Sequence, residues 1–126
     1  MKKLIAAFIL STILLCGCVG QENSGYSQIT QTEAVELIGK QSDCIILDVR
    51  TEAEFAEGHI KNAICVPNES ITDKEPVQLP DKNQLILVYC RSGRRSKEAA
   101  QKLADMGYTN VKEFGGINDW KGEVVK

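Results

Sequence analysis

Short apolar runs alternate with helix-forming segments through most of this chain. The runs at 44–49, 63–66 and 85–89 are rich in β-branched residues, and we expect a fourth strand over 111–114. Strands that are apolar throughout are typically buried on both faces of a parallel sheet, whereas one-sided strands alternate in polarity. Strands separated by helices also favour that topology. The sequence therefore predicts an α/β fold, a small parallel β-sheet with helices on both faces.

The helices are indicated by their start and stop signals. Thr30 and Glu33 have the spacing of a capping box, and an apolar stripe follows that comprises Ala34, Val35, Leu37 and Ile38. Thr51 is a candidate N-cap for a short helix over 52–57, which Gly58 ends. We expect further helices over 96–106 and, as a short last turn, within 115–120.

Composition bounds the function. The chain has 126 residues, of which 43% are hydrophobic and 25% charged, which suits one globular domain. A net charge of −2 argues against a general electrostatic affinity for nucleic acid. The sequence has no Cys-x-x-Cys pair and a single histidine, so we expect no metal site.

The first residues are typical of an export signal. Two lysines precede an apolar run over 4–15, which is too short to span a bilayer comfortably. The run ends in "LCGC", which resembles a bacterial lipobox and implies cleavage before Cys18 and acylation of Cys18. We expect a signal peptide over 1–17, a lipidated cysteine and polar tether over 18–26, and the folded domain over 27–126. An uncleaved anchor and ordinary signal cleavage are the alternatives.

The chain has five cysteines, which fall into two groups. Cys16 and Cys18 belong to the signal region, and Cys44, Cys65 and Cys90 remain in the domain. An odd number of thiols leaves at least one unpaired. A Cys44–Cys65 disulfide and a role for Cys65 as a resolving thiol both stay open at this stage.

The stretch "LVYCRSGRRSKEAA" carries the strongest chemical signal. Its cysteine, Cys90, follows a buried strand and looks the most exposed of the five, and a loop with three arginines and Gly93 separates it from a helix. Unpaired amides at a helix start attract anions, and a glycine lets the backbone curl around one. Such a loop lowers the pKa of a thiol. We therefore expect Cys90 to attack an anionic substrate.

Three motifs in order resemble the rhodanese-type sulfurtransferases. They are "YCRSGRRS", which is similar to the active-site loop of that family, "LDVRTEAEFAEGHIKNAICVP" and "FGGINDW". The resemblance runs from about residue 27 to residue 121. Lys61-Asn62 stands where the family often has Pro-Gly, a difference confined to a turn.

Loop length separates related activities in this resemblance. Phosphatases and arsenate reductases of related type use Cys-x5-Arg, whereas Cys90 to Arg95 is Cys-x4-Arg and Ser96 follows. The shorter loop favours sulfur transfer. A Cys-dependent arsenate reductase or phosphatase is the alternative enzyme, and a sulfide carrier or binding module without turnover is the alternative from another class.

The resemblance implies a mechanism and a set of roles. Cys90 is the catalytic residue, which takes sulfane sulfur from thiosulfate or a related donor and passes it to a thiol or cyanide. The loop residues bind the small anionic donor, namely Arg91, Ser92, Gly93, Arg94, Arg95 and Ser96. Asp48, Arg50 and His59 are expected to support the structure. A Cys90–His59 dyad is disfavoured. We expect no cofactor, and a monomer held outside the cytoplasm on a bacterial membrane by the lipid on Cys18.

Overall fold

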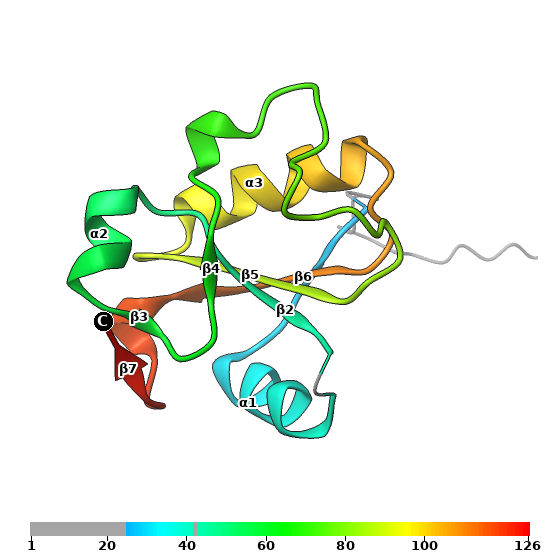
Figure 1. Ribbon diagram of the computed structural model, residues 1–126. Helices are drawn as coiled ribbons and strands as arrows, with labels where there is room; N and C mark the ends of the chain where they lie inside the picture. Colours follow the sequence, from blue (N-terminus) through cyan, green and yellow to red (C-terminus); the bar gives the residue numbers. More distant parts are fainter. Residues whose placement is uncertain (1–24, 42) are drawn as a thin grey trace, which may run out of the picture.

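The computed structural model describes residues 25–41 and 43–126 (Figure 1). The predicted signal peptide over 1–17, which contains Cys16, and the predicted lipidation site Cys18 lie outside the described residues. In chain order the elements are β1 (Ser27–Gln28), α1 (Gln31–Lys40), β2 (Ile45–Asp48), α2 (Glu52–Glu57), β3 (His59–Ile60), β4 (Ile64–Cys65), the 3-10 turn η1 (Asn68–Ser70), β5 (Ile86–Cys90), α3 (Arg94–Asp105), β6 (Val111–Gly116), the 3-10 turn η2 (Ile117–Asp119) and β7 (Val124–Val125).

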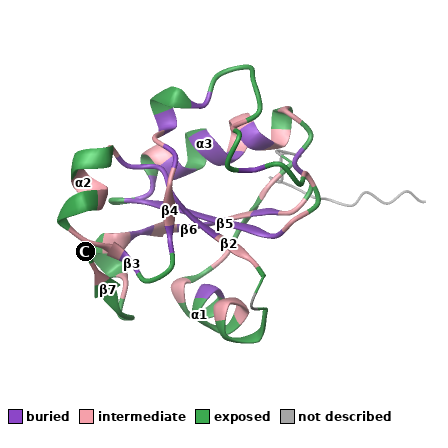
Figure 2. Ribbon diagram, viewed as in Figure 1, coloured by how far each residue is buried: buried purple, intermediate pink, exposed green. Residues whose placement is uncertain are grey.

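Five strands form a parallel sheet in the order β1-β6-β5-β2-β4. The central strand, β5, is buried along its whole length, and helices α1 and α3 lie on opposite faces of the sheet (Figures 1 and 2). The predicted α/β class and parallel sheet are confirmed. A second, two-stranded sheet pairs β3 with β7 in antiparallel orientation.

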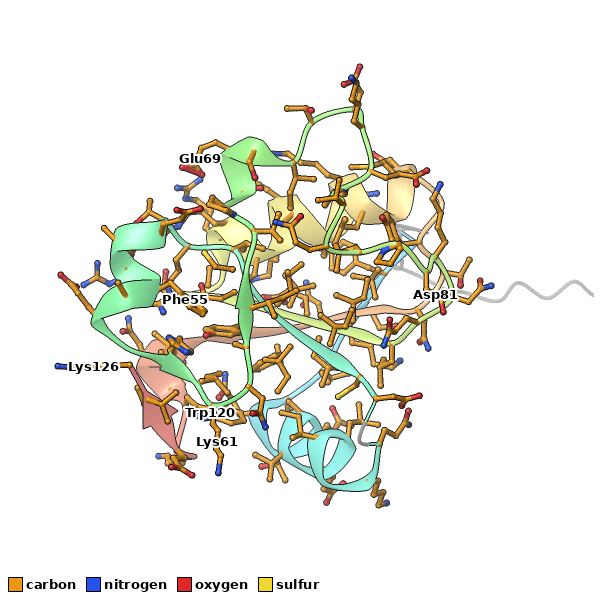
Figure 3. All side chains as sticks on the ribbon, in the orientation of Figure 1. Phe55, Lys61, Glu69, Asp81, Trp120 and Lys126 are labelled. Carbon is orange, nitrogen blue, oxygen red and sulfur yellow. The ribbon has the colours of Figure 1, made fainter. Side chains whose placement is uncertain are left out.

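Alternate residues of the strands feed two separate cores. Ile86 and Val88 of β5 pack with Ala99 and Leu103 of α3, whereas Leu87 packs on the α1 side. Phe55 and Trp120, which Figure 3 labels, are partly buried against this α1-side core. Because both faces of β5 are covered, its sequence is apolar at every position rather than alternating.

Both predicted N-caps are present, whereas one side chain of the predicted apolar stripe over 34–38 is not buried. Thr30 and Glu33 form a capping box on α1, and Thr51 forms another with Glu54 on α2. Val35, placed in the buried stripe by the sequence, is 49% exposed. With 3.6 residues per turn, Ala34, Leu37 and Ile38 share one side of the helix and Val35 falls outside it.

Three strands and one helix boundary differ from the sequence-based expectation. Strands β1, β3 and β7 have two residues each and were not predicted, because so short a segment shows no periodicity. Helix α3 begins at Arg94, two residues before the expected start at Ser96. Gly93, with φ of 121°, turns the chain directly into the helix.

Among the described residues, none of the helices has the length and hydropathy needed to cross a bilayer.

Candidate active site

Cys90 lies at the carboxyl end of the central strand, where the chain turns into α3. It is the last residue of β5, and Gly93 is the N-cap of the helix. A φ of 121° at Gly93 lies in the region that favours glycine. Ligands of parallel α/β sheets bind beyond this end of the strands, so the sheet places the thiol where such chemistry occurs.

The thiol is buried and is surrounded by hydrogen-bond donors. Cys90 is 1% exposed, so the sequence-based impression of an exposed cysteine is wrong. The amide of Gly93 donates to its Sγ at 3.0 Å, and the Ser96 hydroxyl lies 3.5 Å away. Burial raises the pKa of Cys90, but the Ser96 hydroxyl and the amides of Ser96, Gly93 and Ser92 outweigh it and the net pKa is lowered. The site thus favours a thiolate.

The three arginines differ in how they are held. Arg91 and Arg94 are exposed, and Arg94 forms an exposed pair with Glu98 one turn along α3. Arg95 is only 20% exposed at its side chain and forms two hydrogen bonds with Glu54 of α2, at 2.8 and 3.1 Å. Arg91 approaches the same carboxylate at 3.8 Å. Exposed pairs contribute little, so the paired and partly covered Arg95 is the fixed positive charge of the loop.

Glu54 joins α2 to the loop. Its carboxylate accepts from the Thr51 amide at 3.0 Å and from Nη1 and Nη2 of Arg95. The hydrogen bond from Arg95 is the largest influence and lowers the pKa of Glu54 to about 2. The position of Arg95 therefore depends on a residue 41 positions earlier in the chain.

A buried carboxylate stands behind Ser96. Glu113 of β6 is 3% exposed, and its Oε2 accepts from the Ser96 hydroxyl at 2.5 Å and from the Gly115 amide at 2.9 Å. Ser96 is fully buried and lies in the first turn of α3. The Ser96 hydroxyl thus lies between the Cys90 thiol and the Glu113 carboxylate, within hydrogen-bonding distance of both.

The backbone of the loop also touches the end of β6. A Cβ built on Gly116 would lie 2.0 Å from the carbonyl oxygen of Arg91 and 2.6 Å from the Ser92 nitrogen. The Asn118 amide donates to the same Arg91 carbonyl at 3.2 Å. The "GGINDW" segment therefore forms one wall of the loop, and it has room there for a glycine only.

Asp48 and Arg50 lie in the core behind this edge of the sheet. Their ion pair measures 2.7 Å and is almost fully buried. Arg50 also donates to the Gly58 carbonyl at 2.7 Å, and the Tyr89 hydroxyl donates to Asp48 at 2.6 Å. Desolvation and the bond to Asp48 raise the pKa of Tyr89, so it stays protonated. This network links β2, β5 and the segment that leads into β3.

Neither the single histidine nor the other two cysteines of the domain form a hydrogen bond with the Cys90 thiol. The His59 ring stacks on Phe55 with centroids 3.6 Å apart, and its Nδ1 lies 2.9 Å from the Phe55 carbonyl. Cys44 and Cys65 are half-buried free thiols, so the structure contains no Cys44–Cys65 disulfide. Burial raises the pKa of Cys65 to about 11, which makes it a poor nucleophile at neutral pH.

The comparisons with known proteins agree with this geometry. The model of the rhodanese-like domain family matches residues 30–123. The chain belongs to the rhodanese-like family. Within it, relatives named as sulfurtransferases and structures of rhodanese domains mark the chain as a rhodanese-type sulfurtransferase.

Two curated relatives of the rhodanese-like chain are thiosulfate sulfurtransferases. PspE of Escherichia coli is 37% identical over 73 residues, which cover 58% of this chain and 70% of PspE. GlpE of Coxiella burnetii is 37% identical over 97 residues, which cover 76% of this chain and 88% of GlpE. The solved structure described as "rhodanese with anions from E. coli" is 35% identical, with a TM-score of 0.60 over 65% of this chain and 96% of its own.

Two contacts of this rhodanese-like site were not foreseen from the sequence. Glu54 occupies the third position after the Thr51 cap, so the spacing of a capping box was visible, but its pairing with Arg95 was not. Glu113 lies two residues after Val111 and therefore shares its face of the strand, and an acidic residue on that face was the available signal. Over residues 25–41 and 43–126, no three metal-binding side chains gather into a group.

Proposed function

We propose that this sulfurtransferase moves sulfane sulfur from thiosulfate, or a related anionic donor, to a thiol or cyanide through a persulfide on Cys90. The observation that carries the proposal is the setting of the Cys90 sulfur, which receives the Gly93 amide at 3.0 Å at the start of α3. Amides in this position stabilise an anionic sulfur before and after transfer. The names of PspE and GlpE support thiosulfate as the donor.

The first step forms the persulfide. The Cys90 thiolate attacks the outer sulfur of thiosulfate, a new S–S bond forms, and the S–S bond of thiosulfate breaks. Sulfite leaves with the electron pair of that bond, so the two sides balance in atoms and charge. The outer sulfur on Cys90 then carries the negative charge, which the loop amides hold.

The second step returns the thiolate. Cyanide, or the thiolate of an acceptor, attacks the outer sulfur of the persulfide. The bond between the two sulfur atoms breaks, and its electron pair remains on Cys90. The products are thiocyanate or a persulfide of the acceptor, together with free enzyme. No redox partner is required, because the outer sulfur moves between nucleophiles.

The arginines provide the attraction for the donor. Arg91 and Arg94 are exposed at the outer face of the loop, where a dianion in solution meets them first. Arg95 stays bonded to Glu54 beside Cys90. We propose that Arg91 and Arg94 hold the sulfonate of the donor and that Arg95 stabilises the shape of the loop, together with Ser92, Gly93 and Ser96.

A single-turnover experiment tests this function. The full chain is treated with thiosulfate, and the peptide that contains Cys90 is examined by mass spectrometry for the addition of one sulfur atom. Cyanide is then added and thiocyanate is measured. The control is Cys90→Ser, which should give neither product while circular dichroism shows an unchanged fold.

The outcomes separate the three candidate functions. Addition of sulfur followed by thiocyanate supports the transferase. Sulfur loading without discharge to any acceptor points to a carrier, and turnover of arsenate or a phosphoryl substrate points to the alternative enzyme. A folded protein that gives no adduct and no thiocyanate contradicts the proposal.

We also propose that the protein is a monomeric lipoprotein, held outside the cytoplasm by acylated Cys18. The support for lipidation is the sequence "LCGC" after an apolar run. This support comes from the sequence alone, since the segment lies outside the described residues. Detergent-phase partition of the protein expressed in a bacterium is the measurement. We expect wild-type protein in the detergent phase and Cys18→Ala in the aqueous phase, and partition of both variants into the same phase would argue against lipidation.

A further inference from the structure

Glu113 is placed where a carboxylate is costly. It lies on β6, which runs between β1 and β5, and it is 3% exposed. An ionised carboxylate in such a place is destabilising unless hydrogen bonds or a counter-charge compensate it. Among the described residues, no lysine or arginine forms an ion pair with Glu113 within 4.0 Å, and its partners are Ser96 and the Gly115 amide.

Ser96 stands between this carboxylate and the Cys90 sulfur. Its hydroxyl oxygen lies 2.5 Å from Glu113 Oε2 and 3.5 Å from Cys90 Sγ. Carbonyl oxygens of Gly93 and Gly115 also lie within reach, at 3.0 and 3.3 Å. A serine hydroxyl has one proton to donate. When Cys90 ionises, its sulfur and Glu113 are therefore two negative groups that compete for the same proton.

We propose that Glu113 is a positioning residue that draws the Ser96 proton away from Cys90 and so sets how readily Cys90 ionises. This inference relies on the proposed role of Cys90 as the nucleophile. The loop amides stabilise the thiolate, and Glu113 opposes them through Ser96. The opposition has two parts, the loss of the serine donor and the direct repulsion between two buried negative groups.

The competition changes during the catalytic cycle. In the free thiolate the negative charge is on Sγ, next to Ser96. In the persulfide Sγ is bonded to the outer sulfur and is neutral, so Ser96 can donate to Glu113 without cost. The serine hydroxyl is redirected between these states, and only the thiol proton leaves, to solvent.

This arrangement favours the sulfur-loaded enzyme. A thiolate of higher pKa is a stronger nucleophile and a poorer leaving group. Where Cys90 is fully ionised, Glu113 thus promotes the capture of sulfur from the donor and slows its release to the acceptor, whereas below the pKa of Cys90 it reduces the fraction of thiolate. A carboxylate that merely fixed the backbone turn at Gly115 would leave both of these properties unchanged.

Other charges face the same groups and have to be held constant in a test. Lys97 Nζ and Glu113 Oε2 lie 3.5 and 4.0 Å from the point that a Cβ on Gly93 would occupy. Arg95 of α3 interacts electrostatically with Cys90, and Glu54 of α2 neutralises Arg95 in turn. The variants below leave Lys97, Arg95 and Glu54 in place.

The pH profile of thiol alkylation provides the test. The full chain is reacted with iodoacetamide from pH 4 to pH 10, and modification at Cys90 is followed by peptide mass mapping, which separates it from the other cysteines. We expect Glu113→Gln to lower the pKa of Cys90 by about half to one unit, which is roughly a two- to fourfold faster reaction below that pKa, because the gain in thiolate is partly offset by its lower nucleophilicity. Glu36→Gln, an equal change of charge at an exposed position on α1, should leave the profile unchanged.

Two further variants test whether Ser96 carries the effect. Ser96→Ala should raise the pKa of Cys90, because the thiolate loses a donor, and Glu113→Gln added to it should have clearly less effect than in wild type. Glu113→Asp keeps the charge but withdraws the carboxylate from Ser96, so it should lower the pKa by less than Glu113→Gln. An equal effect of Glu113→Gln with and without Ser96 would overturn the route through serine.

The proposal can also be contradicted without any variant. In wild-type protein with carbon-13 labelled glutamate, the carboxyl resonance of Glu113 should shift at the pH where Cys90 ionises, and alkylation of Cys90 should abolish that shift. An unshifted resonance, or an unchanged alkylation profile in folded Glu113→Gln, would overturn the inference. Alkylation and resonance shifts do not require sulfur transfer, so the result is independent of whether the proposed function holds.

Discussion

At the scale of single residues, the shape of the loop after Cys90 depends on one missing side chain. Gly116 has an ordinary extended backbone, with φ of −144°, so its torsion angles do not require glycine. The requirement is spatial, because the Arg91 carbonyl and the Ser92 amide occupy the position of its Cβ. The two halves of the site, the cysteine loop and the end of β6, are thus in contact through backbone atoms.

We predict that Gly116→Ala displaces the loop and reduces sulfur transfer about a hundredfold, because small misplacements of reacting groups have effects of that order. Overpacking should also cost about 1–3 kcal/mol of stability. Single-turnover formation of the Cys90 persulfide and urea unfolding are the measurements. Gly39→Ala is the matched control, because nothing beyond its own helix backbone lies within 4 Å of the position of its Cβ, and activity should be unchanged.

At the scale of elements, the short helix α2 positions the start of α3. Glu54 satisfies the N-terminal amide of its own helix and holds Arg95 of the other helix with the same carboxylate. A six-residue helix is marginal by itself, so this pairing and the capping box stabilise it in the folded protein. Helix α2 therefore supports the site, although the hydrogen bonds of the thiol are formed with Gly93 and Ser96.

We predict that Glu54→Gln lowers stability at pH 7 by on the order of 2 kcal/mol. The pKa of Glu54 is depressed from 4.5 to about 2, so its contribution is complete above pH 4.5 and is lost as the pH falls toward 2. Wild type and Glu54→Gln should therefore converge in urea unfolding as the pH is lowered from 5 to 2. Glu57→Gln, at an exposed position of the same helix, is the control and should leave the free energy of unfolding unchanged. A difference in unfolding free energy between wild type and Glu54→Gln that stays constant from pH 5 to pH 2 would contradict the role of the Glu54 charge.

At the scale of the whole molecule, one buried network connects the sheet to the segment beyond α2. Asp48 of β2 accepts from Arg50 and from Tyr89 of β5, Arg50 reaches the Gly58 carbonyl, and the Ile60 amide donates to the Tyr89 hydroxyl at 3.1 Å. Removing one partner of a buried pair leaves the other charge unsatisfied. The network therefore fixes how the β3–β7 sheet is oriented on the main sheet.

We predict that Asp48→Asn destabilises the fold by about 3–5 kcal/mol, because Arg50 would remain buried without its carboxylate. Tyr89→Phe removes only a hydroxyl and should cost about 1–2 kcal/mol. Both values come from the midpoint and slope of urea unfolding. Equal losses of unfolding free energy in the two variants would mean that the Tyr89 hydroxyl contributes as much to stability as the Asp48–Arg50 pair, which would contradict this prediction.

Much of the site could be predicted because its signals are local in the sequence. The cysteine after an apolar strand, the glycine three residues later and the helix that follows are neighbours in the chain, and the sheet brings them to its carboxyl edge as expected. The exposure of Cys90 was misjudged, since burial depends on what the rest of the fold places around a residue. The helix start was misplaced because the conformation of Gly93 decided it.

The amino-acid sequence alone determined the class of fold, the thiol and the loop that surrounds it. These features depend on hydrophobic pattern, turn residues and capping, which act over a few neighbouring positions. Only the tertiary structure decided that Glu54 holds Arg95 and that Glu113 reaches Ser96, across 41 and 17 positions of sequence. Such contacts form when parallel strands and their helices stack, and no local pattern encodes the distance between two side chains that meet in this way.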